Sequence, residues 1–530
     1  THGDLVVDNE EINGRWTILP SLGGGIAQEN SGGQTLVTDR AEMIPAYFVG
    51  HWVEVRSADD TVKGIWRIES VDGVTVTLEA GADVIEGDQW QGVYRFDTVM
   101  VTGNAKLRSY DPMLVSEVVV TEGSELDVPE MPDLEVLTLG GGTRWTTVHS
   151  PIEAAVMVEV AGLVNAQSIE APLLTVRADG TLSHPPGGGR SLEINVTDVV
   201  IETGGAIDVS SRGYGANETY PGATLNTDNE GAGSHLGEGG ERGNNTPGST
   251  YGSVTRPQEA GAGGRHDTNG RRGGGVVRIE AETVSLEGAV RANGGDATTT
   301  EWHVPGGGGS VWITAPTITG EGAIEVRGGR DIAGTYSRHG GGGAISLEYG
   351  TLSAAIESSL VVRTGDDDGD RGGSGTIYLY GSSSTHGDLV VDNEEINGRW
   401  TVLPSLGGGV ADTGSGGQTL VTDRAETIPA YFVGHWVRIT KSDDSESLWR
   451  IESVDGVTVT LEAGADVVEG DQWQGVYRFD TVMVKGNAKL RVEDHYEFGS
   501  IDVEDGSTID LPNLGAPFVD QSLIDYTVHD

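Results

Sequence analysis

A cluster of acidic residues after the last glycine-rich cycle is the first place where residue types and spacing suggest chemistry. Asp366, Asp367, Asp368 and Asp370 surround the turn residue Gly369. Carboxylate oxygens at a turn are the hard ligands that calcium prefers, although the spacing does not match an EF-hand loop. The cluster is therefore a candidate Ca²⁺ site, the one cofactor that the sequence suggests. A solvated corner of the fold is the alternative interpretation.

Four histidines lie near the glycine-rich segments: His235, His266, His303 and His339. None of them belongs to a spacing, such as His-x-His or HExxH, that places two imidazoles on one metal ion. We expect these side chains to cap or stack within loops.

Polysaccharide lyases and hydrolases need two or three carboxylates, or a base beside bound calcium, converging on one face. Glu280, Glu282, Glu287 and Glu325 instead alternate outward along expected strands, which is typical of a solvated wall. We therefore expect no catalytic residues and no enzyme activity, with a polysaccharide lyase or hydrolase as an alternative.

Tryptophans form a duplicated set that could stack on sugar rings if their faces were exposed. The set comprises Trp52, Trp66 and Trp90 and their copies Trp436, Trp449 and Trp473. All of them lie in alternating apolar and polar runs, where a position in a core is the competing interpretation.

Composition excludes several classes of protein. The formal net charge is 33 − 81 = −48, which argues against a nucleic-acid partner because phosphate binding needs a basic face. No stretch approaches the ~18 apolar residues of a membrane span. The absence of cysteine removes disulfides, zinc–thiolate sites and cysteine nucleophiles. The 83 glycines among 530 residues fall in clusters rather than at every third position, which excludes collagen.

Self-similarity is the strongest signal in the chain. Residues 1–9 return without change as residues 385–393, an offset of 385 − 1 = 384. After Trp52 and Trp436 one residue is lost, and the match continues from Trp66 and Trp449 as far as Pro129 and Pro512. The chain therefore reads as one full repeat and the opening of a second, part of something longer, and duplicated chains of this kind usually form long arrays.

A shorter cycle lies within the repeat. Apolar strands follow Gly275, Gly309 and Gly343 at steps of 34 residues. Two or three such strands per cycle cannot bury an apolar face alone, but stacked cycles can. We therefore expect a parallel β-helix in which Val277, Val311 and Ile345 form a ladder; an antiparallel β-sandwich array is the alternative.

Two kinds of segment interrupt these cycles. Residues 15–96 and their copy 399–479 are rich in aromatic residues and large enough, at roughly 80 residues, for a small antiparallel barrel with its own core. Residues 213–275 are mostly glycine and polar residues, and a loop of this length favours a flexible excursion over an ordered one.

The expected organisation is all-β throughout. Residues 1–14 contribute a first β-helix strand, 15–96 the first inserted barrel, 97–212 β-helix rungs, 213–275 the glycine-rich loop or excursion, 276–398 rungs of 34-residue period, 399–479 the second barrel, and 480–530 rungs of the next repeat.

Residues 273–281, 308–315, 373–379 and 233–240 resemble the glycine-rich β-helix repeats of very large, repetitive bacterial cell-surface and secreted proteins, often described as adhesin-like. The resemblance implies a right-handed parallel β-helix, an extracellular or cell-surface location and a fibrous or adhesive role. It transfers no catalytic residues.

These expectations combine into a structural extracellular protein whose tandem repeats of about 384 residues form a stiff fibre or stalk. The expected partner is the protein itself, through end-to-end or lateral assembly, because a sheet with open ends offers unpaired edges. The competing function is a glycan-binding adhesin that holds surface polysaccharide with its barrels or glycine-rich loops.

Overall fold

A computed structural model describes residues 2–121, 123–128, 131, 134–140, 145–146, 152–227, 230–241, 246–266, 270–298, 304–332, 338–366, 369–512 and 525–528. The fold is all-β. The described residues contain one short α-helix, α1 (Ala354–Ser358), and no helix long and apolar enough to cross a membrane. The chain divides into two compact units, Thr1–Leu182 and Ser183–Asp530, called here the N-terminal and C-terminal units.

Stacked parallel strands build the C-terminal unit. β21 (Leu192–Ile201), β23 (Val276–Glu280), β26 (Ser310–Thr319), β28 (Ala344–Leu352) and β30 (Thr376–Tyr380) pair in parallel, each with the next. Val277 lies opposite Val311, and Val311 opposite Ile345, with all three side chains fully buried. The predicted ladder is therefore confirmed, and its 34-residue step is the distance from one rung to the next.

A second parallel sheet faces the first. β25 (Ala289–Arg291), β27 (Ala323–Glu325) and β29 (Leu360–Val361) pair in register, with Val290 opposite Ile324 and Ile324 opposite Leu360. The third cycle is irregular because α1 lies between its strands. The Ser353 hydroxyl caps that helix by accepting a hydrogen bond from the Ile356 N–H at 3.3 Å.

The N-terminal unit has the same construction with less glycine. β10 (Gln89–Thr102), β12 (Met113–Val120), β14 (Val136–Leu139), β17 (Met157–Val160) and β19 (Ser168–Val176) pair in parallel. Along them runs one continuous buried apolar row, listed in order as Val99, Val118, Leu137, Val158 and Leu174. The described strands between residues 97 and 182 are therefore stacked in parallel, as the sequence predicted.

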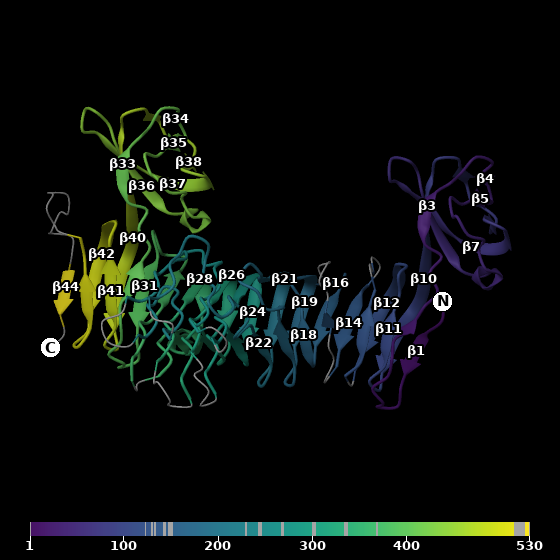
Figure 1. The fold of residues 1–530 in the computed structure, drawn as a ribbon, viewed down its shortest axis with the longest axis horizontal. Helices are drawn as coiled ribbons and strands as arrows, with labels where there is room; N and C mark the ends of the chain where they lie inside the picture. Colours follow the sequence, from purple (N-terminus) through teal and green to yellow (C-terminus); the bar gives the residue numbers. More distant parts are fainter. Residues whose placement is uncertain are drawn as a thin grey trace. The chain divides into compact units, whose positions relative to one another are not determined.

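The first aromatic segment forms a small antiparallel barrel. β6 (Trp52–Arg56) pairs with β7 (Val62–Asp72), which pairs with β8 (Thr75–Leu78), and the first half of β10 completes the order by pairing with β6. Its core is separate and includes Leu36 and Trp90. Figure 1 shows each barrel projecting from the strands of its own unit.

One strand joins the barrel to the rungs. The first half of β10 is antiparallel to β6, whereas its second half pairs in parallel with β1 (Leu5–Asp8) and β12. β2 (Thr17–Ile18) is still part of the rung, because it pairs in parallel with β11 (Lys106–Arg108). The barrel therefore begins after Ile18 rather than at residue 15.

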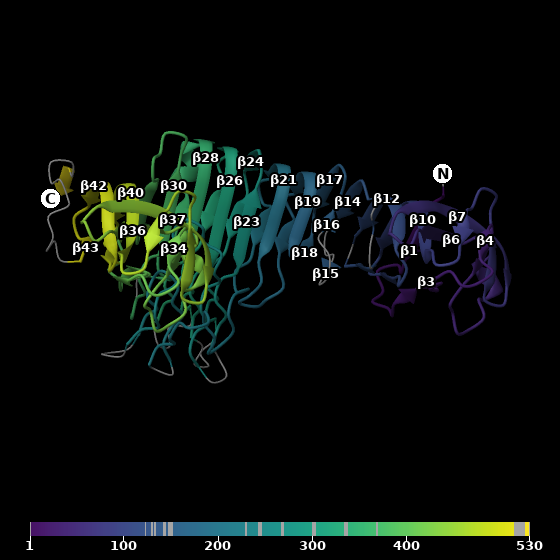
Figure 2. The same cartoon turned by 90° about the horizontal axis from the view of Figure 1, so that it is seen from above.

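The glycine-rich residues form a packed layer. Gly274 donates to Gly307, Gly308 to Gly341 and Gly342 to Gly373, each at 2.9 Å between N and O. A Cβ on Gly308 would lie 2.4 Å from the Val326 carbonyl oxygen, so side chains are excluded and backbones approach closely. Figure 2 shows these segments gathered on one side of β23 to β30.

The described part of residues 213–275 belongs to this layer, contrary to the expectation of a flexible excursion. The Gly261 N–H donates to the Gly274 carbonyl at 2.9 Å, and the Gly233 N–H donates to the Pro305 carbonyl at 3.0 Å. A long loop is ordered when its backbone N–H and C=O groups find hydrogen-bond partners. The sequence alone did not show that other glycine-rich segments would supply these partners.

Candidate binding groove

A polar groove of about 780 Å³ lies where the rungs of the C-terminal unit turn from β25 and β27 into the glycine-rich layer. The groove is lined by Asp208, Ser210, Ser211, Gly270, Arg271, Arg272, Arg291, Asn293, Gly294, Asp296, Thr298, Glu325 and Arg327.

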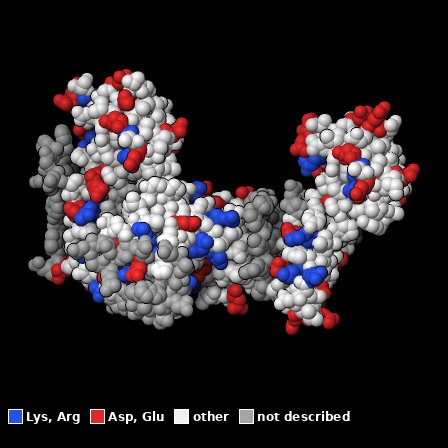
Figure 3. All heavy atoms as spheres, in the orientation of Figure 1, with Lys and Arg blue, Asp and Glu red and all other residues white. Residues whose placement is uncertain are grey.

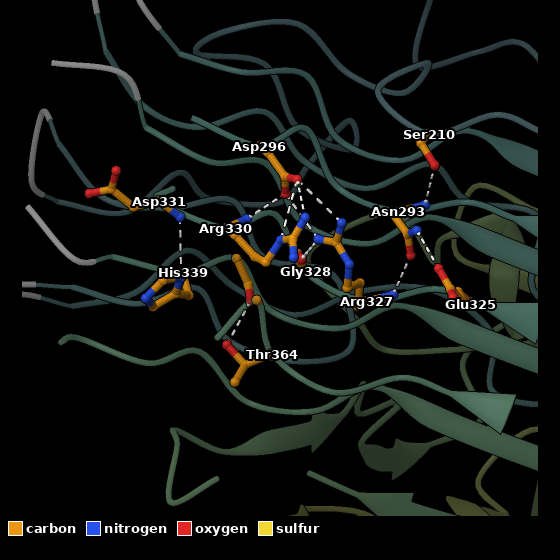
Figure 4. A network of polar contacts seen from close by, with 12 residues as sticks. Ser210, Asn293, Asp296, Glu325, Arg327, Gly328, Arg330, Asp331, His339 and Thr364 are labelled. Carbon is orange, nitrogen blue, oxygen red and sulfur yellow. Dashed lines mark hydrogen bonds and ion pairs between the residues drawn. The ribbon is translucent and has the colours of Figure 1, made fainter. Parts of the chain in front are cut away.

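Asp296 is the centre of a network that joins consecutive rungs (Figure 4). The Arg327 guanidinium donates to both carboxylate oxygens of Asp296, at 2.9 and 3.3 Å. Arg330 adds its backbone N–H at 2.8 Å and its guanidinium at 3.0 Å. Bidentate contacts of this kind fix direction as well as distance. Burial opposes ionisation of Asp296, but the hydrogen bonds from both arginines outweigh it and hold the pKa of this carboxyl below its usual value.

Asn293 makes the second set of links between rungs. Its N–H donates to the Ser210 hydroxyl at 3.2 Å, and its side-chain amide donates to Glu325 at 3.1 Å. Its amide oxygen accepts from the Arg327 N–H at 2.9 Å (Figure 4). Side chains from three successive rungs therefore form the floor of the groove, and hydrogen bonds fix the orientation of their polar groups.

The groove differs in charge from the rest of the protein. Four arginines and three carboxylates line it, a local balance of 4 − 3 = +1 against −48 for the chain. Arg272 is exposed, and its guanidinium donates to the Gly213 carbonyl at 3.2 Å. Figure 3 shows acidic atoms gathered over each barrel, with lysine and arginine atoms mostly over the strands. Guanidinium groups beside hydroxyl and amide groups suit a ligand that carries carboxylates and hydroxyls.

The structure describes two of the four residues of the predicted calcium cluster, so this site stays a prediction. Asp366 is exposed, and the Asp370 backbone is engaged with the preceding rung through a bridge to Arg338. Asp367 and Asp368 lie outside the described residues. Within those residues, no group of three or more histidine or acidic side chains is placed to hold a metal ion.

The histidines near the glycine runs have structural positions where they are described. His235 is fully buried, and its Nδ1–H donates to the Gly308 carbonyl at 2.9 Å. Burial lowers the pKa of His235 to about 4, so the ring is neutral at pH 7. His339 Nδ1 accepts the Asp331 N–H at 3.3 Å, and Thr364 beside it donates to the Gly340 carbonyl (Figure 4). His303 lies outside the described residues.

The tryptophan set divides into two kinds of position. Trp90 and Trp473 are each 2% exposed and lie within the barrel cores, with the indole N–H donating to Asp39 at 3.2 Å and to Asp423 at 3.1 Å. These two rings have no face free for a sugar, which corrects the stacking interpretation for them. Their alternating strands point them inward, as the competing interpretation held.

The remaining four tryptophans are half-buried. Arg95 lies over the ring of Trp52 at 4.6 Å, and Arg478 lies over the ring of Trp436 at 4.7 Å. Cation–π contacts therefore already use these two rings. Trp66 and Trp449 pack against the barrel cores.

The expected wall of carboxylates is partly confirmed. Glu280, Glu282 and Glu287 are exposed, whereas Glu325 is half-buried in the groove and lies 3.4 Å from Arg291. Sequence reasoning missed the groove itself. A signal was present, since Asn293 to Arg327 and Asp296 to Arg330 both repeat the 34-residue step with a change of side-chain type.

The chain matches no protein-family model, and searches of curated proteins and of solved structures find no similar protein.

Proposed function

We propose that this chain is a structural extracellular protein in which tandem repeats of about 384 residues form a stiff shaft that carries small barrels. In this proposal the stacked rungs are a right-handed parallel β-helix and the protein resides at the cell surface or in a secreted fibre. The proposal assigns no catalytic residue and no enzyme activity.

One observation carries the proposal: backbone pairing continues from the end of one repeat into the next. β28 pairs in parallel with β30, β30 is antiparallel to β31 (Asp388–Asp392), and the parallel order resumes from β31 to β40 (Gln472–Lys485) and from β40 to β42 (His495–Val503). The residue pairs along this path are Ile345 with Ile377, Ile377 with Val390, and Val390 with Met483. A tensile load would thus be shared by hydrogen bonds across the boundary between repeats.

The surface supports the same role. Each barrel folds around its own core and projects from the rungs, so it adds bulk without interrupting the stack. The charge of −48 opposes nonspecific association of such shafts at low ionic strength, and salt or divalent cations would screen it.

Electron microscopy of this chain, and of chains lengthened by one or two extra repeats, tests the proposal. Each added rung should lengthen the particle by about 4.8 Å at constant width, because that is the spacing of paired strands. Particles that grow in width with each added repeat would overturn the shaft.

The groove favours a second function, binding of acidic polysaccharide. Four arginines and the amide of Asn293 line a space large enough for sugar residues, in a protein otherwise short of positive charge. Binding of polygalacturonate to the whole chain, measured by calorimetry, should weaken by about tenfold in Arg272→Ala, because one charge-assisted contact is lost. Arg15→Ala, an exposed arginine outside the groove, is the matched control and should bind normally. Equal binding by both variants would remove the groove from this function.

A further inference from the structure

The first rung of the N-terminal unit leaves apolar side chains uncovered. Val6, Ile12 and Ile18 are 60%, 65% and 52% exposed, and Tyr47 of the adjoining barrel is 68% exposed. Among the described residues, β1 pairs with β10 alone and β2 with β11 alone, so each has one unpaired edge. We call residues 5–18 together with Tyr47 the open rung.

The same sequence occurs again in the C-terminal unit, where it is covered. The equivalents of Val6, Ile12 and Tyr47 are Val390, Ile396 and Tyr431, all unchanged in type, and Ile18 becomes Val402. Ile396 is only 7% exposed, although it retains the local backbone bond to Asn393 that Ile12 makes to Asn9. The difference therefore comes from the neighbours of the rung and not from its own conformation.

Backbone pairing supplies part of this cover. β30 lies antiparallel to β31, with Tyr378 opposite Leu389. Gly237 bridges Thr401, the Val402 N–H donates to the Leu236 carbonyl at 3.2 Å, and the Glu238 N–H donates to the Trp400 carbonyl at 3.0 Å. The glycine-rich layer thus occupies the edge that β2 leaves open in the N-terminal unit.

Side chains complete the cover. Leu236, Val254 and Tyr378 join one core with residues of the repeated sequence, which are Leu389, Val391, Leu403, Tyr477 and Phe479. The Tyr220 ring lies 5.4 Å from that of Tyr431.

Two polar contacts specify the register of this joint. Thr364 donates its N–H to Asn393 Oδ1 at 2.9 Å, and Arg363 pairs with Glu394 at 2.9 Å. The equivalents of the two partners in the open rung are Asn9 and Glu10, again unchanged. The open rung therefore has the same apolar residues and the same polar residues that form the complete joint in the C-terminal unit.

We propose that the open rung is a docking surface for a second copy of the glycine-rich half of the repeat, residues 183–384, presented by a repeat joined directly ahead of Thr1. The joint would repeat the contacts described above with residues 388–403 and Tyr431, which are made by Tyr220, residues 236–238, Val254, Arg363, Thr364 and Tyr378. This inference rests on the proposed function, since it describes how successive repeats of a shaft connect.

Single cysteines test the joint, because the chain contains no other cysteine. Ile12→Cys is made in two proteins. One is the present chain, and the other is the present chain with an added copy of residues 1–384 joined ahead of it. In both proteins the cysteine replaces Ile12 of the present chain. We expect thiol labelling to slow by about tenfold or more in the extended chain, because the thiol must then wait for local opening. Ile396→Cys in the present chain sets the rate for a covered position.

Met43→Cys is the matched control. Met43 is 75% exposed and its equivalent, Thr427, is also exposed, so its labelling should be equally fast in both chains. Labelling of Ile12→Cys at the same rate in both chains would overturn the joint. Tyr378→Ala in the added repeat should restore fast labelling at Ile12→Cys, because it removes an apolar contact of the cover.

The joint and the shaft fail in different ways. Slowed labelling with particles that do not lengthen would retain the joint and reject the shaft. Unchanged labelling with particles that lengthen would retain the shaft and reject this joint. Slowed labelling of the unextended chain at high protein concentration would show that another surface covers the open rung, and would also overturn the proposal.

Discussion

Two copies of one sequence, residues 1–96 and 385–479, fold alike but have different surroundings. Their barrel cores are equivalent: Leu36 and Leu420 are fully buried, and Trp90 and Trp473 are equally buried. The rungs beneath them differ, as Ile12 is exposed and Ile396 is covered. A barrel of this size buries its own apolar residues, whereas a strand in a stack of parallel strands depends on the strands beside it.

The largest expected effect is one that the two copies share. Trp90→Ala and Trp473→Ala should each destabilise their barrel by about 3–5 kcal/mol, because each removes a large buried ring and a hydrogen bond. Hydrogen exchange of the barrel amides measures the loss in each copy separately. Met43→Ala, at an exposed barrel position, is the control and should change little. Clearly unequal losses would show that a barrel depends on its surroundings.

The next effect should separate the copies. Ile396→Ala is expected to cost about 2 kcal/mol or more, because a covered side chain leaves a cavity. Ile12→Ala should lie within about 0.5 kcal/mol of the parent, as is usual at exposed positions. Amide exchange in the corresponding rung reports both. Equal costs would contradict the difference in cover.

A smaller effect isolates the glycine-rich cover. A Cβ on Gly237 would lie 2.3 Å from the Gly373 oxygen and 2.5 Å from the Ser374 oxygen. Gly237→Ala should therefore cost about 1–3 kcal/mol and speed exchange in β31 while leaving β1 unchanged. Gly189→Ala is the control, since a Cβ there meets nothing within 4 Å. An unchanged β31 would mean that the layer does not stabilise the second copy.

The effect that is smallest near neutral pH is a dependence of stability on pH within the cover. The pKa of buried His235 is lowered to about 4, so below pH 6.5 the unfolded chain binds a proton that the folded chain does not. Stability should therefore fall as the pH drops from 6.5 to 4, by at most about 1.4 kcal/mol per pH unit from this ring.

His235→Asn keeps a donor for the Gly308 carbonyl and removes the titration. This substitution should flatten the pH dependence of amide exchange around residues 233–262. The stability of the whole chain should still depend on pH, because burial also lowers the pKa of His184 to about 4. A slope identical to that of the parent would show that His235 does not contribute.

Periodicity carried most of the prediction of the fold. The 34-residue step from Val277 to Val311 to Ile345 anticipated the ladder. Boundaries were less accurate: Thr17 and Ile18 belong to the rung, because β2 pairs with β11. Helix α1 was not foreseen, since the cycle that begins at Gly343 was expected to contain strands alone.

Sites were harder to predict than strands. The alternation of apolar and polar residues showed that Trp90 belongs to a strand but not whether its side of the strand is buried. Only the closed barrel shows that its ring lies inside. The groove combines Ser210, Asn293 and Arg327, which are far apart in the sequence and differ in type. The 34-residue step connects Asn293 with Arg327, but no pattern adds Ser210 to them, because stacking of the rungs creates that proximity.

The sequence by itself determined the repeat, the alternation of buried and exposed residues and the segments that must insert between rungs, since these follow from spacing along one chain. Only the tertiary structure decided that residues 213–275 pack as a layer and that identical rungs have different exposure. Backbone groups of glycine carry no side-chain signal for their partners, so the pairing of glycine runs becomes visible only once the rungs are stacked.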